Sequence, residues 1–458
     1  MEQRSLQFYR LRTALVLSGS FDSDFWNDLL PQVGRSEPTI QHAMMAVASV
    51  HEQVEAQGAS FSQSYQRDYM RGRDSRFALQ QYNKAIRHLN RRVSQDAQSE
   101  EIVLSCCLLF ICLEFLRGDI ERGITHLRNG LHILVNWRDR VGKSSADKAS
   151  PFPSSSDNIS DVLTQILSRQ TLQYFLCGRS TCYQHPDISE SGQPGPLPAT
   201  FLTLLEARSS MDHIIKVSLR FLKVAIQSKY EPENEAKINL KKTRQEFAEQ
   251  LDKWSDAFAS LLANKSLVRR QDQRASWTLQ ILYTVSKIWL GNCLESDEMA
   301  YDAHTDGFRT ILALVSSLKN DALSENDERS SIWESSSAAK QTHGFTFEMG
   351  VITPLYLTVS KSRNPIIRRA AISLLATTIP RREGLWDANL LGAVGQRIME
   401  IEEGSLEVGE SRPPEQKRIH DFVINSYDDN RESQCITFML RPDGPQGDWL
   451  LVDEEVTW

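Results

Sequence analysis

The sequence predicts an all-α protein, a multi-helix array of packed helical hairpins with a small C-terminal β-sheet. Apolar residues recur at helical spacing from near the start of the chain to about residue 403. Beyond that point the period changes to two, and turn sequences separate three alternating segments. Helix pairs recur without a fixed sequence period, so a solenoid repeat is not supported.

Length, composition and charge indicate a folded globular protein and argue against a nucleic-acid-binding one. The chain has 458 residues, more than one compact core usually holds, and its 40% hydrophobic and 24% charged residues are ordinary globular usage. Its 52 Lys and Arg against 59 Asp and Glu give a net charge of -7. Phosphate would repel such a chain unless its basic residues were strongly segregated onto one face. Composition therefore gives nucleic-acid binding no support.

Cysteine usage and the longest apolar run bear on the compartment. Seven cysteines are few, odd in number and mostly in apolar settings, which suits a reducing, intracellular environment. The start, MEQRSLQFYRLR, has no apolar core of the signal-peptide kind. The longest apolar run, VLSCCLLFICLEFL, is too short to cross a bilayer. We expect no secretion and no membrane span.

The first elements carry helix-start signals. In FDSDFWNDLL, Asp22 or Ser23 can cap a helix with one apolar face. In SEPTIQHAMMAVASVHE, Ser36 is a candidate N-cap and Pro38 falls in the first turn, where its missing N–H is harmless. FALQQYNKAIRHLNRRV then places arginines opposite an apolar face, which predicts a half-buried helix.

The most apolar segment is predicted to form the central helix of the N-terminal helical unit. VLSCCLLFICLEFL is apolar all round, so we expect a fully buried helix in which Cys106, Cys107 and Cys112 pack as small hydrophobes. Gly118 should end it, and Asp119 should cap the next helix, which folds back as a hairpin.

Composition shifts divide the chain into four parts. The Lys-, Ser- and Pro-rich VGKSSADKASPFPSSSD predicts a linker, and HPDISESGQPGPLPA and SENDERSSIWESSSAAK predict loops. Long helical segments are expected at 201–228, 235–264, 267–293, 299–319, 345–360, 364–378 and 384–403. The predicted parts are an N-terminal helical unit (1–138), a flexible linker (139–158), a helical body (159–403) with loops near 183–199 and 320–343, and a β-strand tail (404–458).

The usual catalytic and metal-binding signatures are missing from the sequence. It has no dinucleotide fingerprint, phosphate loop, nucleophile elbow or H-E-x-x-H. Cys177, Cys182 and His185 come nearest to a metal cluster, but their spacing suits no common zinc site and a fourth ligand is not evident. Asp22 and Asp24 resemble a paired carboxylate, yet capping of a helix start explains them better. We predict no metal site and no cofactor.

The histidines do not form catalytic pairs either. His42 and His51 are nine residues apart, about two and a half turns, and so point to opposite faces of one helix. With Glu52 they are expected at the surface and at a boundary. His126 and His132 fail the same geometric test. We therefore assign no catalytic residue.

The segment IIRRAAISLLATTIPRREGLWDANLL, residues 366–391, can be interpreted as a nucleic-acid patch or as two helices and the corner between them. The first helix has an apolar stripe with arginines to its sides. The stripe is Ile366, Ile367, Ala370, Leu374 and Leu375, and the arginines are Arg363, Arg368 and Arg369.

The corner itself favours the second interpretation. Pro380 forces a turn, and Arg381 and Arg382 lie just past the carbonyl end of the first helix, where positive charge is stabilising. Glu383 and Gly384 lead into the next helix, and Trp386 is expected to pack across the corner. We therefore predict no DNA-binding residue in this segment, and we expect no direct binding of nucleic acid by the chain.

Several of these stretches, taken in order, resemble the regulatory (middle homology) region of fungal transcription factors of the binuclear zinc cluster class. They cover most of the chain from about residue 10 to its end, and none is a catalytic motif. The stretches are GSFDSDFWNDLLPQVGRSEPTIQHAMMAVASVHE, EEIVLSCCLLFICLEFLRGDIERGITHLRNGLHIL, FEMGVITPLYLTVSKSRNPIIRRAAISLLATTIPRREGLWD and the closing RIHDFV with its terminal Trp.

The resemblance implies a nuclear protein that works through partners of the transcription machinery, a related DNA-binding factor or a small-molecule effector. Members of that class read DNA with an N-terminal cluster of six cysteines around two zinc ions. This sequence has no C-x-x-C and no heptad run before residue 20, so those residues have no counterpart in it.

Two hypotheses follow. We expect a regulator-like protein without its own DNA-reading head, or a truncated gene model of one, with effector-binding residues unknown. The alternative is a helical enzyme or small-ligand-binding protein on the same scaffold, whose polar residues converge only in three dimensions.

Overall fold

The computed structural model describes most of the chain. The described residues are 1–458 except for 58–72, 95–99, 142–158, 177–196, 265–268, 333–343, 349, 379–380, 405, 407–411 and 426–432.

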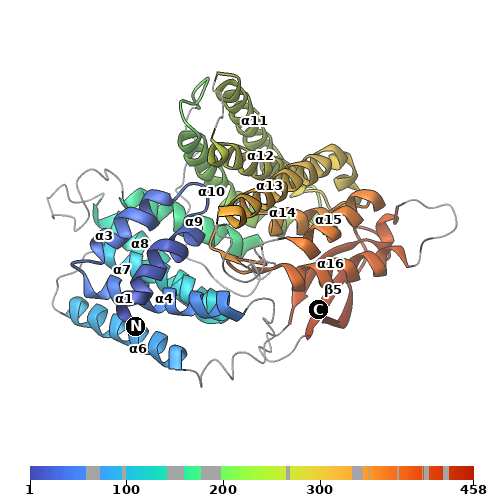
Figure 1. Cartoon of the computed structure of the whole chain (residues 1–458). Helices are drawn as coiled ribbons and strands as arrows, with labels where there is room; N and C mark the ends of the chain where they lie inside the picture. The colour runs from blue at the N-terminus through green and yellow to red at the C-terminus, as the bar shows by residue number, and fades with distance from the viewer. Residues whose placement is uncertain are drawn as a thin grey trace.

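The N-terminal helices pack around one central helix, as predicted (Figure 1). That helix is α7, and nearly all of its side chains are buried. The helices of this part are α1 (Glu2–Phe8), η1 (Tyr9–Thr13), α2 (Ala14–Ser18), η2 (Asp24–Leu29), α3 (Leu30–Val33), α4 (Pro38–Gln57), α6 (Arg73–Ser94), α7 (Glu100–Arg117), α8 (Ile120–Val141) and α9 (Ile159–Leu176).

The end of α7 confirms the signals read there. Gly118 takes a φ of 79°, in the region that favours glycine, and ends the helix. Asp119 Oδ1 then accepts a hydrogen bond from the backbone N–H of Arg122 at 3.1 Å, which caps α8. All three cysteines of α7 are buried, and burial raises the pKa of the Cys107 thiol to about 12.

Other start signals were wrong. Ser23 makes no side-chain cap, and Asp22 pairs instead with Arg169 on α9. Ser36 donates back to the carbonyl of Val33 at 3.2 Å. Only Asp22 has a distant side-chain partner, because Ser23 donates to the adjacent Asp24 and Ser36 to a backbone carbonyl three residues earlier.

Three helices build a second core beside the first. It draws on α10, α11 and α12 and includes the stacked rings of Trp254 and Phe258, whose centroids are 4.7 Å apart. The remaining helices, α13 to α16, pack back toward the N-terminal part (Figure 1). The bounds are α10 (Leu204–Ser228), α11 (Glu235–Asn264), α12 (Arg270–Asn292), η3 (Glu298–His304), α13 (Thr305–Ile332), α14 (Ile352–Lys361), α15 (Pro365–Thr377) and α16 (Ala388–Glu403).

Two small sheets complete the fold. β4 (Ile419–Ile424), β5 (Ser433–Leu440) and β6 (Leu450–Thr457) form an antiparallel sheet, which confirms the period-two pattern. β1 (Phe345–Thr346) pairs in parallel with β2 (Arg382–Glu383), which pairs with β3 (Trp386–Asp387).

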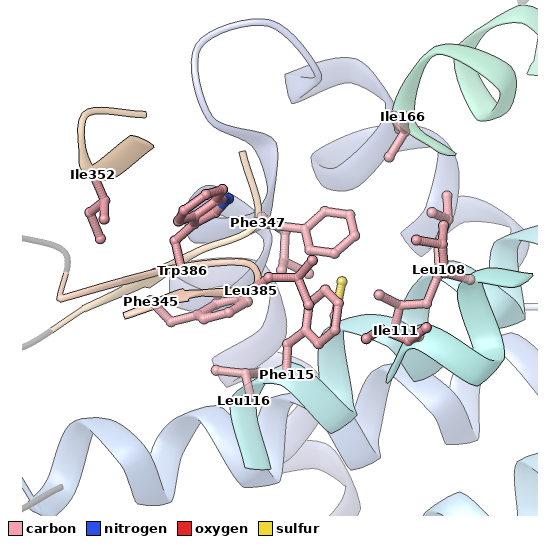
Figure 2. Close-up of a cluster of buried hydrophobic side chains, with 14 of the residues drawn as sticks. Leu108, Ile111, Phe115, Leu116, Ile166, Phe345, Phe347, Ile352, Leu385 and Trp386 are labelled. Atoms are coloured by element: carbon pink, nitrogen blue, oxygen red, sulfur yellow. The ribbon is translucent and has the colours of Figure 1, made fainter. Parts of the chain in front are cut away.

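The largest hydrophobic cluster joins the N-terminal helices to α13–α16 and to the C-terminal strands. Figure 2 shows where they meet: Phe345, Phe347 and Trp386 gather beside Phe115 and Leu116 of α7. The ring centroids of Phe115 and Phe347 are 6.5 Å apart. A core of this kind spans the predicted parts 1–138, 159–403 and 404–458.

Some predicted boundaries can be compared with the structure. α13 continues to Ile332, well into the predicted loop near 320–343. The linker at 139–158 and the loop near 183–199 fall almost wholly outside the described residues. None of the described helices is long and apolar enough to cross a bilayer.

The predicted stripe on α15 was displaced by one position. Ile366 is 80% exposed and Ala370 is exposed, whereas Ile367, Ala371 and Leu375 are buried. The helix begins as its sequence requires. Asn364 stands just before Pro365, and its Oδ1 accepts hydrogen bonds from the backbone N–H groups of Ile366 and Ile367. The rotation places Arg368 on the buried face.

Candidate functional site: a charge network and a polar junction

Buried ionised side chains gather where the end of α10 meets η3, α14, α15, α16 and β4. Charged groups are seldom fully buried unless they are paired, so the cluster is the least expected part of this interior. We call it the charge network, and its members are Lys229, Glu298, Asp302, Lys361, Arg363, Arg368, Glu402 and Arg418.

Glu298 lies at one centre of the network and is fully buried. Its carboxylate accepts from Lys361 Nζ at 2.8 Å, Lys229 Nζ at 3.2 Å and Arg363 Nη1 at 3.4 Å. Burial alone would raise the pKa of Glu298, but these three cations outweigh it and hold the pKa well below its usual range. The group therefore stays ionised.

Glu402, near the end of α16, is the second centre. It accepts from Arg363 Nη2 at 2.9 Å, from Arg368 Nη2 at 2.6 Å and from the backbone N–H of Ile419 at 2.7 Å. Burial raises its pKa, and the two guanidinium groups more than reverse that effect. Glu402 thus fixes both α15 and the start of β4 to α16.

The arginines use their other donors on backbone carbonyls. Arg363 donates to the carbonyls of Lys361 and Ile419, each at 3.0 Å, and Arg368 Nε donates to the carbonyl of Ser362 at 2.9 Å. Such forked geometry is what a guanidinium provides and an ammonium does not. The network can therefore hold six segments in one arrangement, with its five cations shared among three carboxylates and several backbone carbonyls.

A second group of charges, which we call the polar junction, joins the turn before η2 to α9, α10 and the segment 345–348. Arg169 pairs with Asp22 and, at 2.8 Å, with Asp212. Arg208 contacts Asp212 at 3.0 Å and Glu348 at 3.1 Å. The junction consists of Asp22, Arg169, Arg208, Asp212 and Glu348.

The segment 345–348 is held from several sides near this junction. The backbone N–H of Ser20 donates to Glu348 at 2.9 Å, and Thr346 Oγ1 donates to the carbonyl of Val16 at 3.2 Å. From α9, Gln170 and Gln173 both donate to the carbonyl of Phe347, at 2.9 and 3.3 Å.

The hairpin of β2 and β3 supplies a third buried carboxylate. Glu383 accepts from the backbone N–H groups of Gly350, Val351 and Ile352 at 2.7 to 3.0 Å, at the start of α14. Burial raises the pKa of Glu383 to about 7, although these bonds act to lower it. Gly384 takes a φ of 57°, and a Cβ there would lie 2.2 Å from Gln173 Oε1.

The structure separates the histidines that the sequence singled out. His51 is buried, not at the surface, with its Nδ1 3.0 Å from Thr13 Oγ1, and burial lowers its pKa to about 4. His42 bonds instead with Gln81 at 2.6 Å. His126 lies 2.9 Å from the Tyr82 hydroxyl and His132 is exposed, whereas Cys177, Cys182 and His185 lie outside the described residues.

The arginines of 363–382 do not form a surface patch. Arg363 and Arg368 are 1% and 0% exposed, within the charge network. Arg381 donates to the carbonyl of Leu375 at 2.7 Å, at the end of α15, and Arg382 pairs with Asp387 at 3.0 Å. Trp386 is buried, as expected at a corner, and Pro380 lies outside the described residues.

Local pattern gave no signal for Glu298, Glu402 or Glu383. Each lies in an ordinary polar context, and their partners are 17 or more residues away along the chain. Across the part of the chain that the structure describes, no group of three or more His, Cys, Asp or Glu side chains is arranged to hold a metal ion.

Comparison with known proteins identifies the group to which this scaffold belongs. Residues 4–296 match the family described as the fungal specific transcription factor domain. The aspercryptin biosynthesis cluster-specific transcription regulator atnN of Emericella nidulans is 26% identical over 324 residues, which cover 69% of this chain and 49% of the relative. The transcription regulator lscL of Purpureocillium lilacinum is 28% identical over 117 residues, 25% of this chain and 27% of the relative.

No solved structure matches the chain significantly. The chain spans about half or less of the length of these curated relatives. The family match covers well over half of the chain, with α1 to α12 and the polar junction residues Asp22, Arg169, Arg208 and Asp212 inside it. The chain belongs to the fungal specific transcription factor domain family.

Proposed function

We propose that the chain is a regulator of transcription that acts in the nucleus through protein partners or a small effector. The observation that carries this proposal is the family match over residues 4–296, supported by two relatives that are both named as transcription regulators. Because the chain spans only part of those relatives, the proposal concerns the regulatory scaffold and not their target genes.

Selection of a DNA sequence is proposed to come from elsewhere, either from a partner or from sequence outside these 458 residues. The class reads bases with a six-cysteine zinc cluster. The seven cysteines present include no pair at C-x-x-C spacing, and Cys106, Cys107 and Cys112 are buried in α7.

A regulator is favoured over the enzyme alternative by the state of the charged groups. An acid or base in catalysis must be able to reach a substrate proton. Glu298 and Glu402 are fully buried and occupied by the arginines and lysines of the charge network. This arrangement supports a scaffold that fixes its segments, not one that offers a titratable side chain to a ligand.

A tethering experiment tests the proposal. The full chain is fused to a heterologous sequence-specific DNA-binding domain and expressed with a reporter that carries the matching operator. The expected result is reporter activity that differs, upward or downward, from that of the DNA-binding domain alone. The same fusion on a reporter without the operator should have no effect.

A folding control makes a negative result informative. The fusion carrying Glu402→Gln, which removes one centre of the charge network, should lose the effect, while Glu400→Gln, at an exposed carboxylate of the same helix, should keep it. A nuclear, folded fusion that is indistinguishable from the DNA-binding domain alone would overturn the proposal.

A further inference from the structure

One helix is strongly basic although the chain as a whole is acidic. α6 contains six Arg or Lys residues and one Asp within 22 residues, whereas the chain carries a net charge of -7. The longest helix, α11, contains five Arg or Lys and five Asp or Glu in its 30 residues. Positive charge is therefore concentrated on α6, which is the condition under which an acidic chain can still attract phosphate.

Arg76, Arg87 and Arg91 of α6 lie on its outer side. The inner side, with Phe77, Ala78 and Ala85, is buried, and α6 packs along α4 at the edge of the molecule (Figure 1). The exposed positions recur every three or four residues, so they form one stripe. That stripe consists of Arg76, Gln80, Asn83, Arg87, Asn90, Arg91 and Ser94, and Val93 is exposed beside its C-terminal end.

Three arginines of this stripe are available for an external partner. Lys84 pairs with Glu2 at 3.3 Å and Arg92 pairs with Glu37 at 2.8 Å. None of the ion pairs found among the described residues involves Arg76, Arg87 or Arg91. The pKa of the neighbouring His88 is lowered, first by burial and then by nearby cations that include Arg91 and Arg87, in keeping with a positive local potential.

The composition of the stripe favours nucleic acid over protein as the occupant. Protein interfaces depend on buried aromatic or aliphatic anchors, and the stripe offers none between Arg76 and Arg91. Protein–DNA interfaces are instead polar and positively charged, with Arg, Asn and Gln as common donors to phosphate. At 1.5 Å per residue, Arg76 and Arg91 are about 22 Å apart along the helix, enough to reach phosphates on both sides of a major groove about 12 Å wide.

We propose that the outer face of α6 binds the sugar–phosphate backbone of duplex DNA through Arg76, Arg87 and Arg91. The contact adds affinity without selecting bases, and so goes beyond the proposed function, in which base selection lies elsewhere. The net charge predicted that phosphate would repel the chain unless its basic residues were segregated onto one face. On α6 they are segregated, so this condition is met.

Binding of the purified full chain to short fluorescent duplexes of unrelated sequence, followed by anisotropy over a range of salt, tests this proposal. The expected Kd lies between about 10⁻⁴ and 10⁻⁶ M near physiological salt, similar for all the duplexes. Each neutralised phosphate contributes about 0.9 to the slope of log K against log salt, so R87Q/R91Q should lower that slope by about 2.

A matched control lies on α11. Lys242 and Lys253 are exposed on that charge-balanced helix, so K242Q/K253Q removes the same charge from a different face and should leave the slope unchanged. Both double variants should unfold at the denaturant concentration of the wild type, since all four side chains are exposed.

Three outcomes would overturn the proposal: no binding to any duplex at low salt, equal slopes for wild type and R87Q/R91Q, or an equal loss in K242Q/K253Q. Tighter binding to anionic lipid vesicles or to polyglutamate than to duplex at the same ionic strength would assign the face to another partner. The tethered reporter depends on a heterologous DNA-binding domain, so the regulator proposal and this one can fail separately.

Discussion

The surroundings of α7 and the centre of the charge network are both buried, but they are built from different kinds of side chain. Around α7 the buried side chains are mostly apolar, as at Leu109 and Ile111, and their burial is stabilised without directional bonds, while the buried Glu114 there pairs with Arg117. In the charge network, Glu402 and Arg368 are just as buried and depend on bonds of defined direction. Burial alone therefore does not indicate how a site will respond to substitution.

The largest expected difference comes from removing one charge from the network. Glu402→Gln takes from Arg363 and Arg368 the carboxylate that they share, leaving Arg363 with Glu298 at 3.4 Å and Arg368 with Glu403 at 3.5 Å, and we expect the free energy of unfolding to fall by about 3 to 5 kcal/mol. Glu400→Gln, at an exposed carboxylate of the same helix that pairs with Arg397, should cost less than about 1 kcal/mol. Denaturant unfolding of both variants measures the contrast, and equal losses would contradict it.

Glu383 tests a buried carboxylate that has backbone donors but no adjacent cation. Its pKa is raised from 4.5 to about 7, so between these values the folded state holds a proton that the unfolded chain has released. Stability from this group is then present below pH 4.5 and is lost as the pH rises toward 7, by about 3 kcal/mol in total.

Comparison of the wild type with Glu383→Gln separates the pH dependence due to Glu383 from that of the other titratable groups. His51, whose pKa is lowered to about 4, acts in the opposite direction in both proteins and cancels in the difference. Relative to E383Q, the wild type should become less stable as the pH is raised from 5 to 8, as followed by urea unfolding. A difference that stays constant across this range would contradict the raised pKa.

Conservative replacements in the charge network and around α7 should also differ in their cost to stability, but by a smaller amount. Arg363→Lys keeps the charge but loses the fork that reaches Glu402 and two carbonyls, so we expect a loss of about 2 to 3 kcal/mol. Leu109→Met conserves volume in the apolar region and should cost less than about 1.5 kcal/mol. Thermal unfolding of the pair is sufficient, and a larger loss for L109M would reverse the comparison.

The smallest effect is expected on α15, between two adjacent isoleucines. Ile366→Ser removes a side chain that is 80% exposed and should change stability by less than about 0.5 kcal/mol. Ile367→Ser removes a buried one and should cost several times more. Similar losses of stability for the two variants would indicate that both isoleucines are buried, as the sequence predicted.

Sequence reasoning succeeded where the determining interaction was local. Gly118 and Asp119 mark the end of α7 and the start of α8 through their own backbone and side chain. The period-two pattern of QCITFMLRP likewise predicted a strand, which forms as β5, with Ile436 and Phe438 buried. In these cases the element and its signal lie within a few residues of each other.

It failed where a distant partner decided the outcome. A helix cap is worth about 1 kcal/mol, and Asp22 pairs instead with Arg169, 147 residues away. Arg363 and Arg368 were placed at the sides of a helix because Glu402, 39 and 34 residues further on, could not be located in advance. The basic face of α6 became visible only once helix and exposure were both known.

The contacts of segment 345–348 with the start of the chain have a consequence for biosynthesis. Thr346 bonds to Val16 across 330 residues and Glu348 bonds to Ser20 across 328. At a synthesis rate of about 5 to 20 residues per second, roughly 15 to 65 s separate the emergence of the two ends of these bonds. For that interval the nascent N-terminal helices lack Phe347 against Phe115, so this apolar surface stays uncovered while the rest of the chain is made.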